Sequence, residues 1–281
     1  TAQDLVAIPN VGINSGTFAL TPASVALTAA AFPLSGTVNG YRILTGGLSG
    51  SVNVGPGETY TTLSAAAGLF SAINAGGLTG NLTANITGNI TIEDGANALN
   101  AINYGCAGTY TLTIKPAAAV TATVSGSSAG ALIKLNGADN VIIDGSNNGS
   151  TSRDLTIINT GTTAPTAISL ISLGIGLGAT NNTIKNCNIS TGVQSTIGYG
   201  IAVGGSTPGT SGADNDNVTI QNNNITDCAV GIYAIGTAAV SAGGDDNLNI
   251  LGNSIVYNGT LANVIAIKIG QTLNSTVSTN T

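Results

Sequence analysis

The sequence predicts an all-β fold in which short strands coil into a solenoid with three strands per turn. One apolar strand type recurs and closes each time on a glycine: Gly137, Gly174, Gly204, Gly236 and Gly270. These glycines lie 37, 30, 32 and 34 residues apart. A second strand type that starts with aspartate or asparagine follows each of the first four, and a short third strand comes soon after. Because length varies only in the connections, we expect each strand to stack on its equivalent one turn away, about 4.8 Å distant.

Isoleucines recur at equivalent places in successive turns. They form two columns: Ile184, Ile220 and Ile250 in the second strand type, and Ile189, Ile225 and Ile255 in the third. Their spacing does not match one face of a helix, and β-branched residues next to glycine argue against helix as well. We therefore expect each column to point inward as a stack of like side chains.

Asparagines cluster between the second and third strand types, where the chain must turn sharply. Asparagine tolerates the left-handed backbone of a tight bend, and stacked amides can hydrogen-bond to one another. Two neighbouring columns result. Asn223 and Asn253 form one, with Cys187 as its odd member, while Asn186 and Asn222 form the other, interrupted at the next turn by a glycine. The sequence leaves open which of the two columns points inward.

The segments NNTIKNCNIS, NVTIQNNNIT and GIYAIG resemble the repeats of the right-handed parallel β-helix family, as found in pectate-lyase-like folds. The resemblance covers about residues 58–281. Two other stretches, VGPGETYTTLSAAAGLFSAINAGGLTGNLTANITGNITI and LIKLNGADNVIIDGSNNGSTSRDLTIIN, are similar to a subfamily of secreted bacterial surface proteins. The resemblance implies a right-handed parallel β-helix at an extracellular, secreted or cell-surface location. It says little about activity, because the family includes lyases, hydrolases, adhesins and structural fibres.

The N-terminal part departs from the repeat. The segment TTLSAAAGLFSAINAGG predicts a helix near residues 61–75, with Leu63, Ala66, Ala67, Phe70 and Ile73 on one face and a Gly-Gly stop. The family resemblance implies that this helix caps the first turn. Residues 1–57 contain apolar strands with Pro and Gly turns and predict a short N-terminal β arm or small β module, followed by the β-helix over 58–281.

Composition excludes several classes of function. The chain has six basic and twelve acidic residues, no histidine and a net charge of −6, which argues against a nucleic-acid partner. No apolar run reaches the roughly 18 residues of a membrane span. Three scattered cysteines, Cys106, Cys187 and Cys228, are too few for a disulfide framework or a zinc site. They are interpreted as small buried hydrophobes, with one disulfide plus a free thiol as the alternative.

Four aspartates precede the second strand type in two successive turns, where stacking would align them along one edge. They are Asp214, Asp216, Asp245 and Asp246. One interpretation is a Ca²⁺ site, because hard cations prefer carboxylate and amide oxygens. The other is that these side chains cap tight turns. The sequence indicates no other cofactor and no catalytic residues.

Sparse charge without a catalytic constellation favours a non-enzymatic structural role. The chain would be a solenoid subunit or segment of a surface adhesin, stalk or self-assembling filament, in contact with copies of itself head to tail or with neighbouring segments of one long protein. Surface glycans are a further candidate partner. The alternative is a polysaccharide-binding or polysaccharide-cleaving protein, which requires acids and bases gathered in one groove. A third interpretation is ice binding through threonine-rich strands such as TYTLTI, although threonine is a routine outward strand residue.

Overall fold

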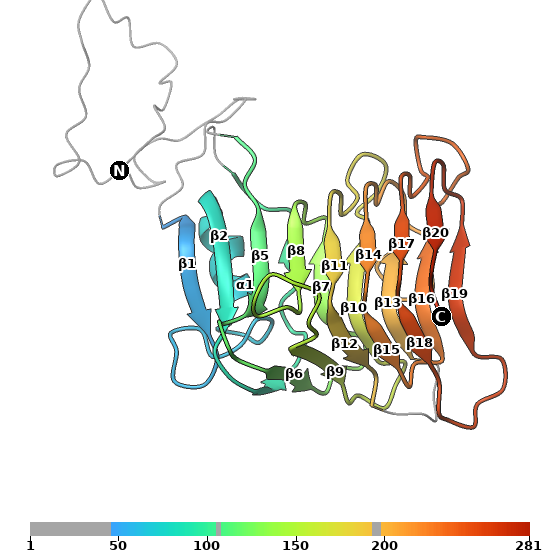
Figure 1. Cartoon of the computed structure of the whole chain (residues 1–281). Helices are drawn as coiled ribbons and strands as arrows, with labels where there is room; N and C mark the ends of the chain where they lie inside the picture. Colours follow the sequence, from blue (N-terminus) through green and yellow to red (C-terminus); the bar gives the residue numbers. More distant parts are fainter. Residues whose placement is uncertain (1–45, 105–107, 193–197) are drawn as a thin grey trace, which may run out of the picture.

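The computed structural model describes residues 46–104, 108–192 and 198–281. Its strands form three parallel sheets, called A, B and C, which contain eight, six and six strands (Figure 1). From β2 onward, the chain passes through sheets A, B and C in turn. Each strand inside a sheet pairs in parallel with its equivalents in the preceding and following turns, and the end strands pair on one side. The expected all-β fold, a right-handed parallel β-helix with three strands per turn, is confirmed.

The strands of each sheet follow one another along the solenoid axis. Sheet A contains β1 (Leu48–Val54), β2 (Leu78–Ile86), β5 (Leu112–Pro116), β8 (Val141–Asp144), β11 (Thr183–Lys185), β14 (Thr219–Gln221), β17 (Asn249–Leu251) and β20 (Thr276–Ser278). Sheet B contains β3 (Ile90–Glu93), β6 (Ala122–Gly126), β9 (Leu155–Asn159), β12 (Cys187–Ser190), β15 (Asn224–Thr226) and β18 (Ser254–Val256). Sheet C contains β4 (Leu99–Asn100), β7 (Ala131–Asn136), β10 (Thr166–Ile171), β13 (Tyr199–Gly204), β16 (Val230–Ile235) and β19 (Ile265–Gly270).

The two isoleucine columns lie in the core, as the repeat predicts. In sheet A, Ile220 pairs with Ile184 on one side and Ile250 on the other, and all three are fully buried. In sheet B, the column of Ile189, Ile225 and Ile255 has the same register. Its last member is only partly buried, because it belongs to the final turn of the described chain.

The structure decides which asparagine column points inward. Asn223 and Asn253 are fully buried, so theirs is the inner column. Asn186 and Asn222 occupy the bend itself, with left-handed φ values of 58° and 52°, and Gly252 takes the same conformation in the next turn with φ 61°. The glycine in this column thus replaces asparagine where only the backbone conformation is required.

Loop length differs between the corners of the solenoid. In three successive turns, the connection from sheet A to sheet B is one or two residues long, such as Asn186 alone between β11 and β12. The connections from sheet C to sheet A are longer and span residues 172–182, 205–218 and 236–248. The corner between sheets C and A therefore carries most of the loop surface in this part of the chain.

The N-terminal helix is shorter than expected and starts later. Helix α1 (Leu69–Gly76) packs against β4 and β1 at the N-terminal end of the solenoid (Figure 1). Residues before Gly68 do not continue it: Leu69 N and Phe70 N donate to the Thr62 and Leu63 carbonyls, seven residues back and not four. The buried carboxylate of Glu93 accepts the backbone N–H groups of Leu63 at 2.5 Å and Ser64 at 2.8 Å and so fixes this segment against β3. The helix buries Leu69, Phe70 and Ile73, whereas Ala66 and Ala67, assigned to its apolar face, are exposed turn residues.

The predicted boundary at residue 57 is placed too far along the chain. Strand β1 pairs with β2 from Leu48↔Leu78 to Val54↔Ile86 and is therefore the first strand of sheet A. The sequence hides this because β1 is followed by the helix-bearing segment before the regular repeat starts. The rest of the proposed arm, residues 1–45, lies outside the described residues. Within the described residues, no helix is long and apolar enough to cross a membrane.

The two described cysteines are buried, free thiols. Cys187 stacks in the inner asparagine column and Cys228 lies between β15 and β16. Burial raises the pKa of Cys228 to about 12 and raises that of Cys187 as well. Both thiols thus act as small hydrophobes, as expected; Cys106 lies outside the described residues.

Candidate functional site

The outer face of sheet A carries a row of small polar side chains. Strand alternation places these residues outward, between inward-facing aliphatic positions, and neighbours in the row belong to successive turns about 4.8 Å apart. The members of this hydroxyl row are Ser51, Thr83, Thr113, Ile142, Thr183, Thr219, Asn249 and Thr276. Only one member, the isoleucine, is apolar.

A second outward row lies two residues further along the same strands and carries amides and charges. The members of this charged row are Asn53, Asn85, Lys115, Asp144, Lys185, Gln221, Leu251 and Ser278. Together the two rows make a long polar surface that runs parallel to the solenoid axis. Sheet A can be followed along its whole length in Figure 1.

An ion pair lies in the middle of the charged row. Lys185 Nζ stands 3.2 Å from Asp144 Oδ2, and the two residues are direct neighbours on β11 and β8. The lysine side chain is 35% exposed, whereas the aspartate side chain is only 12% exposed and Asp144 is buried, so the lysine is the side of the pair that faces solvent. The other carboxylate oxygen, Oδ1, accepts hydrogen bonds from Ser146 N at 3.0 Å and Asn186 Nδ2 at 2.7 Å. Asp144 is thus held in one orientation.

A chain of polar side chains connects this aspartate to an arginine on the next corner. Arg153 donates from Nη2 to Asn222 Oδ1 at 2.6 Å and from Nε to the Asn222 carbonyl at 2.7 Å. Asn222 Nδ2 donates to Asn186 Oδ1 at 2.7 Å, and Asn186 in turn donates to Asp144. Arg153, Lys185 and Lys115 are three of the six basic residues of the chain. Sheet A and its corner with sheet B therefore hold three of the five basic residues that lie in the described part of the chain.

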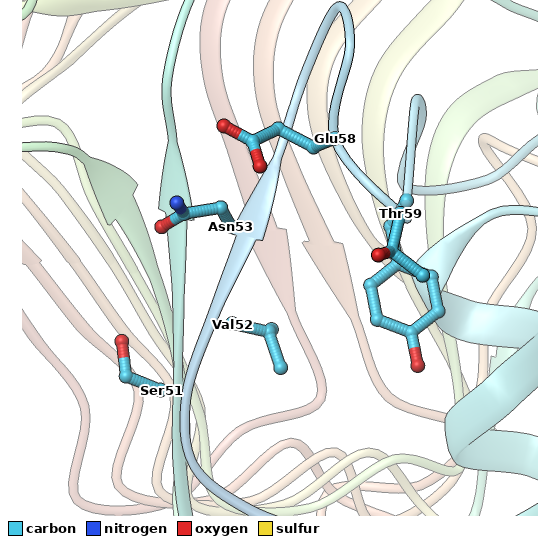
Figure 2. A pocket seen from close by; sticks show the side chains of 6 residues that line it. Ser51, Val52, Asn53, Glu58 and Thr59 are labelled. Atoms are coloured by element: carbon cyan, nitrogen blue, oxygen red, sulfur yellow. The ribbon is translucent and has the colours of Figure 1, made fainter.

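A hollow of about 320 Å³ lies at the N-terminal start of both rows. It is lined by Ser51, Val52, Asn53, Glu58, Thr59 and Tyr60. Figure 2 shows Ser51 and Asn53 on one side of β1 and Val52 on the other. The lining includes one carboxylate, Glu58, and no basic side chain, so this hollow does not reproduce the acid–base pair further along the sheet.

The Asp144–Lys185 pair can do acid–base chemistry. A carboxylate held next to an ammonium group can act as a general base or nucleophile, and the cation can stabilise negative charge that develops on a substrate oxygen. The partner of Asp144 is a lysine and not a second acid, so the pair lacks the two-carboxylate arrangement of most glycoside hydrolases. Gln221 and the hydroxyl row add neutral groups that suit sugar hydroxyls.

The four aspartates proposed for Ca²⁺ form hydrogen bonds to the backbone of neighbouring turns. Asp214 accepts Gly176 N at 2.6 Å through Oδ2 and Gly243 N through Oδ1. Asp216 accepts Asp246 N at 2.7 Å. Asp246 accepts Leu273 N at 2.8 Å and Asp245 accepts Asn215 N at 3.2 Å, each through Oδ1. These contacts join successive turns of the solenoid and are not bonds within the aspartates' own local turns.

These carboxylates do not surround a common point. Among the described residues, no group of three or more acidic, cysteine or histidine side chains is placed to hold a metal ion. Burial raises the pKa of Asp245 to about 7 and raises that of Asp216, and neighbouring acids add to both effects. The Ca²⁺ site itself stays a prediction.

Sequence reasoning missed the Asp144–Lys185 pair, although a signal was available. Aligning Asn140 of DNVIIDG with Asn181, the first asparagine of NNTIKN, places Asp144 and Lys185 at the same position of successive turns. Equivalent positions of a solenoid are in contact, so this alignment predicts an ion pair. The hydrogen bond from Arg153 to Asn222 joins residues that are 69 positions and two turns apart, and no local sequence pattern predicts it.

Comparison with known proteins finds similar solved structures but no matching family model and no matching curated sequence. No protein-family model and no curated protein sequence matches the chain. Two solved structures of pectin methylesterase from Aspergillus niger, one of the deglycosylated form and one of the penultimately deglycosylated form, are similar to it. Each shows 17% sequence identity and a TM-score of 0.46, and the match covers 79% of this chain. The chain matches only 62% of the length of that enzyme.

This comparison corrects one expectation. The sequence predicted a protein that is not an enzyme, but the solved structures that share its fold are those of an enzyme. The absence of an obvious catalytic motif in the sequence was the reason for that prediction. It is an unsafe reason in a solenoid, because residues from different turns, such as Asp144 and Lys185, meet only after the chain has coiled.

Proposed function

We propose that this chain is an extracellular protein that binds a polysaccharide along the outer face of sheet A and acts on it through Asp144 and Lys185. The observation that carries the proposal is the ion pair in the middle of two mainly polar rows, which only Ile142 and Leu251 interrupt. Hydroxyl, amide and charged groups that repeat about every 4.8 Å suit a polymeric ligand with many hydroxyl groups. The similar fold of a pectin-modifying enzyme fits this substrate class without establishing it.

Binding and cleavage assays on acidic and neutral polysaccharides, with and without added Ca²⁺, test the proposal. Lys185→Ala should weaken binding about tenfold or more, because a hydrogen bond to a charged group contributes about 1.5–3 kcal/mol. Asp144→Asn should abolish cleavage while retaining binding. Lys268→Ala is the matched control, since this lysine lies on sheet C over the Tyr233 ring. Equal effects of the two lysine substitutions, or no polysaccharide binding at all, would contradict the proposal.

Head-to-tail association stays a prediction, and one surface supports it. Strands β18, β19 and β20 stand last in their sheets among the described residues. Side chains that continue the buried columns are exposed there, including Ile269 at 42% and Val277 at 43%. Unpaired strand edges with apolar side chains favour pairing with another strand. Light scattering over a range of protein concentrations would show either oligomers that grow with concentration or a constant monomer mass.

A further inference from the structure

The connection from β8 to β9 contacts the asparagine bends of the two following turns. Arg153, in this connection, donates to the side-chain oxygen and the carbonyl of Asn222, at 2.6 Å and 2.7 Å. The Thr151 carbonyl accepts Asn222 Nδ2 at 3.2 Å. The Ser150 carbonyl accepts Asn186 Nδ2 at 3.3 Å. One connection thus reaches two further turns at the corner between sheets A and B.

The hydrogen bonds that connect Arg153 to Asp144 can run in only one direction. Arginine has donors and no acceptor, whereas an ionised carboxylate has acceptors and no donor. Asn222 must therefore turn Oδ1 towards Arg153 and Nδ2 towards Asn186. Asn186 must then turn its own Nδ2 towards Asp144. The structure shows both orientations, with 2.7 Å for each of these two amide-nitrogen contacts, and we call the four residues the amide relay.

The amide relay ends on the carboxylate oxygen that does not face Lys185. Oδ1 of Asp144 accepts Asn186 Nδ2 at 2.7 Å and Ser146 N at 3.0 Å. Oδ2 lies 3.2 Å from Lys185 Nζ. Rotation of the carboxyl group would break both hydrogen bonds to Oδ1. The relay therefore keeps Oδ2 as the oxygen that faces the lysine and is left for a substrate.

The bend itself does not need the asparagine side chains. Gly252 takes the same position one turn after Asn222, with φ 61° against 52°. Glycine adopts this left-handed backbone readily, so the bend forms without any side chain. Asn186 and Asn222 stand in the two turns that the amide relay crosses, and the glycine follows directly beyond them. Their amides thus have a role that the bend does not explain.

We propose that Arg153 is a positioning residue that acts through the amide relay and holds Oδ2 of Asp144 directed at Lys185. The inference rests on the proposed function of this pair. When the relay is interrupted, the carboxyl group can rotate and spends less time in the reactive orientation, which slows the chemical step. Substrate binding is retained, because Lys185 and the two outward rows of sheet A are unchanged.

Steady-state kinetics of cleavage tests the proposal, with polygalacturonate as the acidic probe and a soluble β-glucan as the neutral one. Asn186→Gly removes the last amide without straining the bend and should lower kcat about tenfold, with KM changed less than about twofold. Arg153→Gln removes the charged donor and should lower kcat about threefold to tenfold. Lys134→Gln is the matched control, because it removes a positive charge from β7 on sheet C. It should change neither kcat nor KM.

A double substitution separates the amide relay from independent local effects. In the Asn186→Gly background, Arg153→Gln should cause no further loss of kcat, because the relay is already interrupted at its other end. The proposal fails if the two losses multiply, as they do for independent sites. It also fails if Arg153→Gln lowers kcat no more than Lys134→Gln does. If Asn186→Gly does not fold, Asn222→Gly interrupts the same relay and takes its place.

NMR of the intact protein adds a readout that needs no substrate. The side-chain amide signals of Asn186 should shift in Arg153→Gln, although Asn222 lies between the two residues, and should stay in place in Lys134→Gln. Unchanged Asn186 signals in Arg153→Gln overturn the amide relay. If the signals shift but the unsubstituted protein cleaves neither probe, it is the proposed function that fails.

Discussion

The corner between sheets A and B and the corner between sheets C and A share one hydrogen-bonding pattern. They differ in one side-chain atom, an amide nitrogen at the first and a carboxylate oxygen at the second. At the corner between sheets A and B, Asn223, Asn253 and Asn280 form the amide ladder. Each member accepts through Oδ1 the backbone N–H of the residue one turn earlier, at 2.9–3.0 Å. Each donates through Nδ2 to a carbonyl of the preceding turn, at 2.9 Å. At the corner between sheets C and A, the corresponding pair is Asn215 and Asp245.

The difference shows what asparagine contributes to this fold. A buried corner leaves both an N–H and a carbonyl without a strand partner, and an amide side chain satisfies both at once. A carboxylate satisfies only the N–H, and its second oxygen is left buried without a donor, as in Asp245. Three successive substitutions test this comparison, in order of decreasing effect.

The largest effect on stability is expected when an amide side chain is buried at a position where no unpaired backbone N–H or carbonyl group can bond to it. Ile220→Asn interrupts the buried isoleucine column of sheet A and buries an unsatisfied amide, which together should cost about 3–5 kcal/mol of unfolding free energy. Thr219→Asn is the control, because Thr219 faces outward and already pairs with an asparagine, Asn249. Urea unfolding of both variants gives the two values. A cost below about 1 kcal/mol for Ile220→Asn would show that the core tolerates amides generally.

A smaller effect on stability is expected when a carboxylate oxygen, as in Asp245, replaces an amide nitrogen in the ladder. Asn223→Asp removes the donor to the Ile184 carbonyl and buries a charge, so we expect a loss of about 2–4 kcal/mol at pH 8. Burial should raise the pKa of the new carboxyl, so the loss should shrink as the pH falls towards 5. Asn224→Asp, at the half-buried neighbouring position, serves as the control. Equal losses at both positions, or a loss that does not vary with pH, would contradict the proposed role of the amide.

The smallest effect is expected at the last member of the ladder. Asn280 is half-buried, whereas Asn253 is fully buried. Asn280→Ala removes bonds to Asn253 N and to the Ile250 carbonyl, and because water can replace part of them we expect a cost of about 1 kcal/mol. Asn253→Ala should cost at least twice as much. If the order of the two losses is reversed in thermal unfolding, burial does not control the strength of the ladder.

Most of the fold could be predicted because it repeats. The isoleucine columns and the three-strand turn follow from spacing alone, since equivalent positions must stack. The inner asparagine column could not be chosen, because Asn222 and Asn223 are adjacent and differ only in backbone conformation. Strand β1 and the start of helix α1 were misplaced for another reason. Both depend on contacts made elsewhere in the chain, through β2 and through Glu93.

The candidate site was far less predictable than the fold. Acidic residues that are close in sequence, such as Asp214 and Asp216, attracted attention, yet each caps a turn of a neighbouring coil. The charges that do meet, Asp144 and Lys185, are 41 residues apart and lie in strands that look unremarkable alone. In a solenoid, proximity in space follows the position within the turn and not the distance along the sequence. Function must therefore be sought across aligned turns.

Unequal corners have a consequence for how such a chain can change over time. Between sheets A and B, three successive turns bend through only one or two residues, such as Asn186, whereas the connection from β8 to β9 spans residues 145–154. Between sheets C and A, loops of very different length are already accepted, such as residues 137–140 and residues 205–218. Insertions at this corner can accumulate independently of one another and of the core. The loops at this corner can thus form new recognition surfaces while the buried columns that specify the fold stay the same.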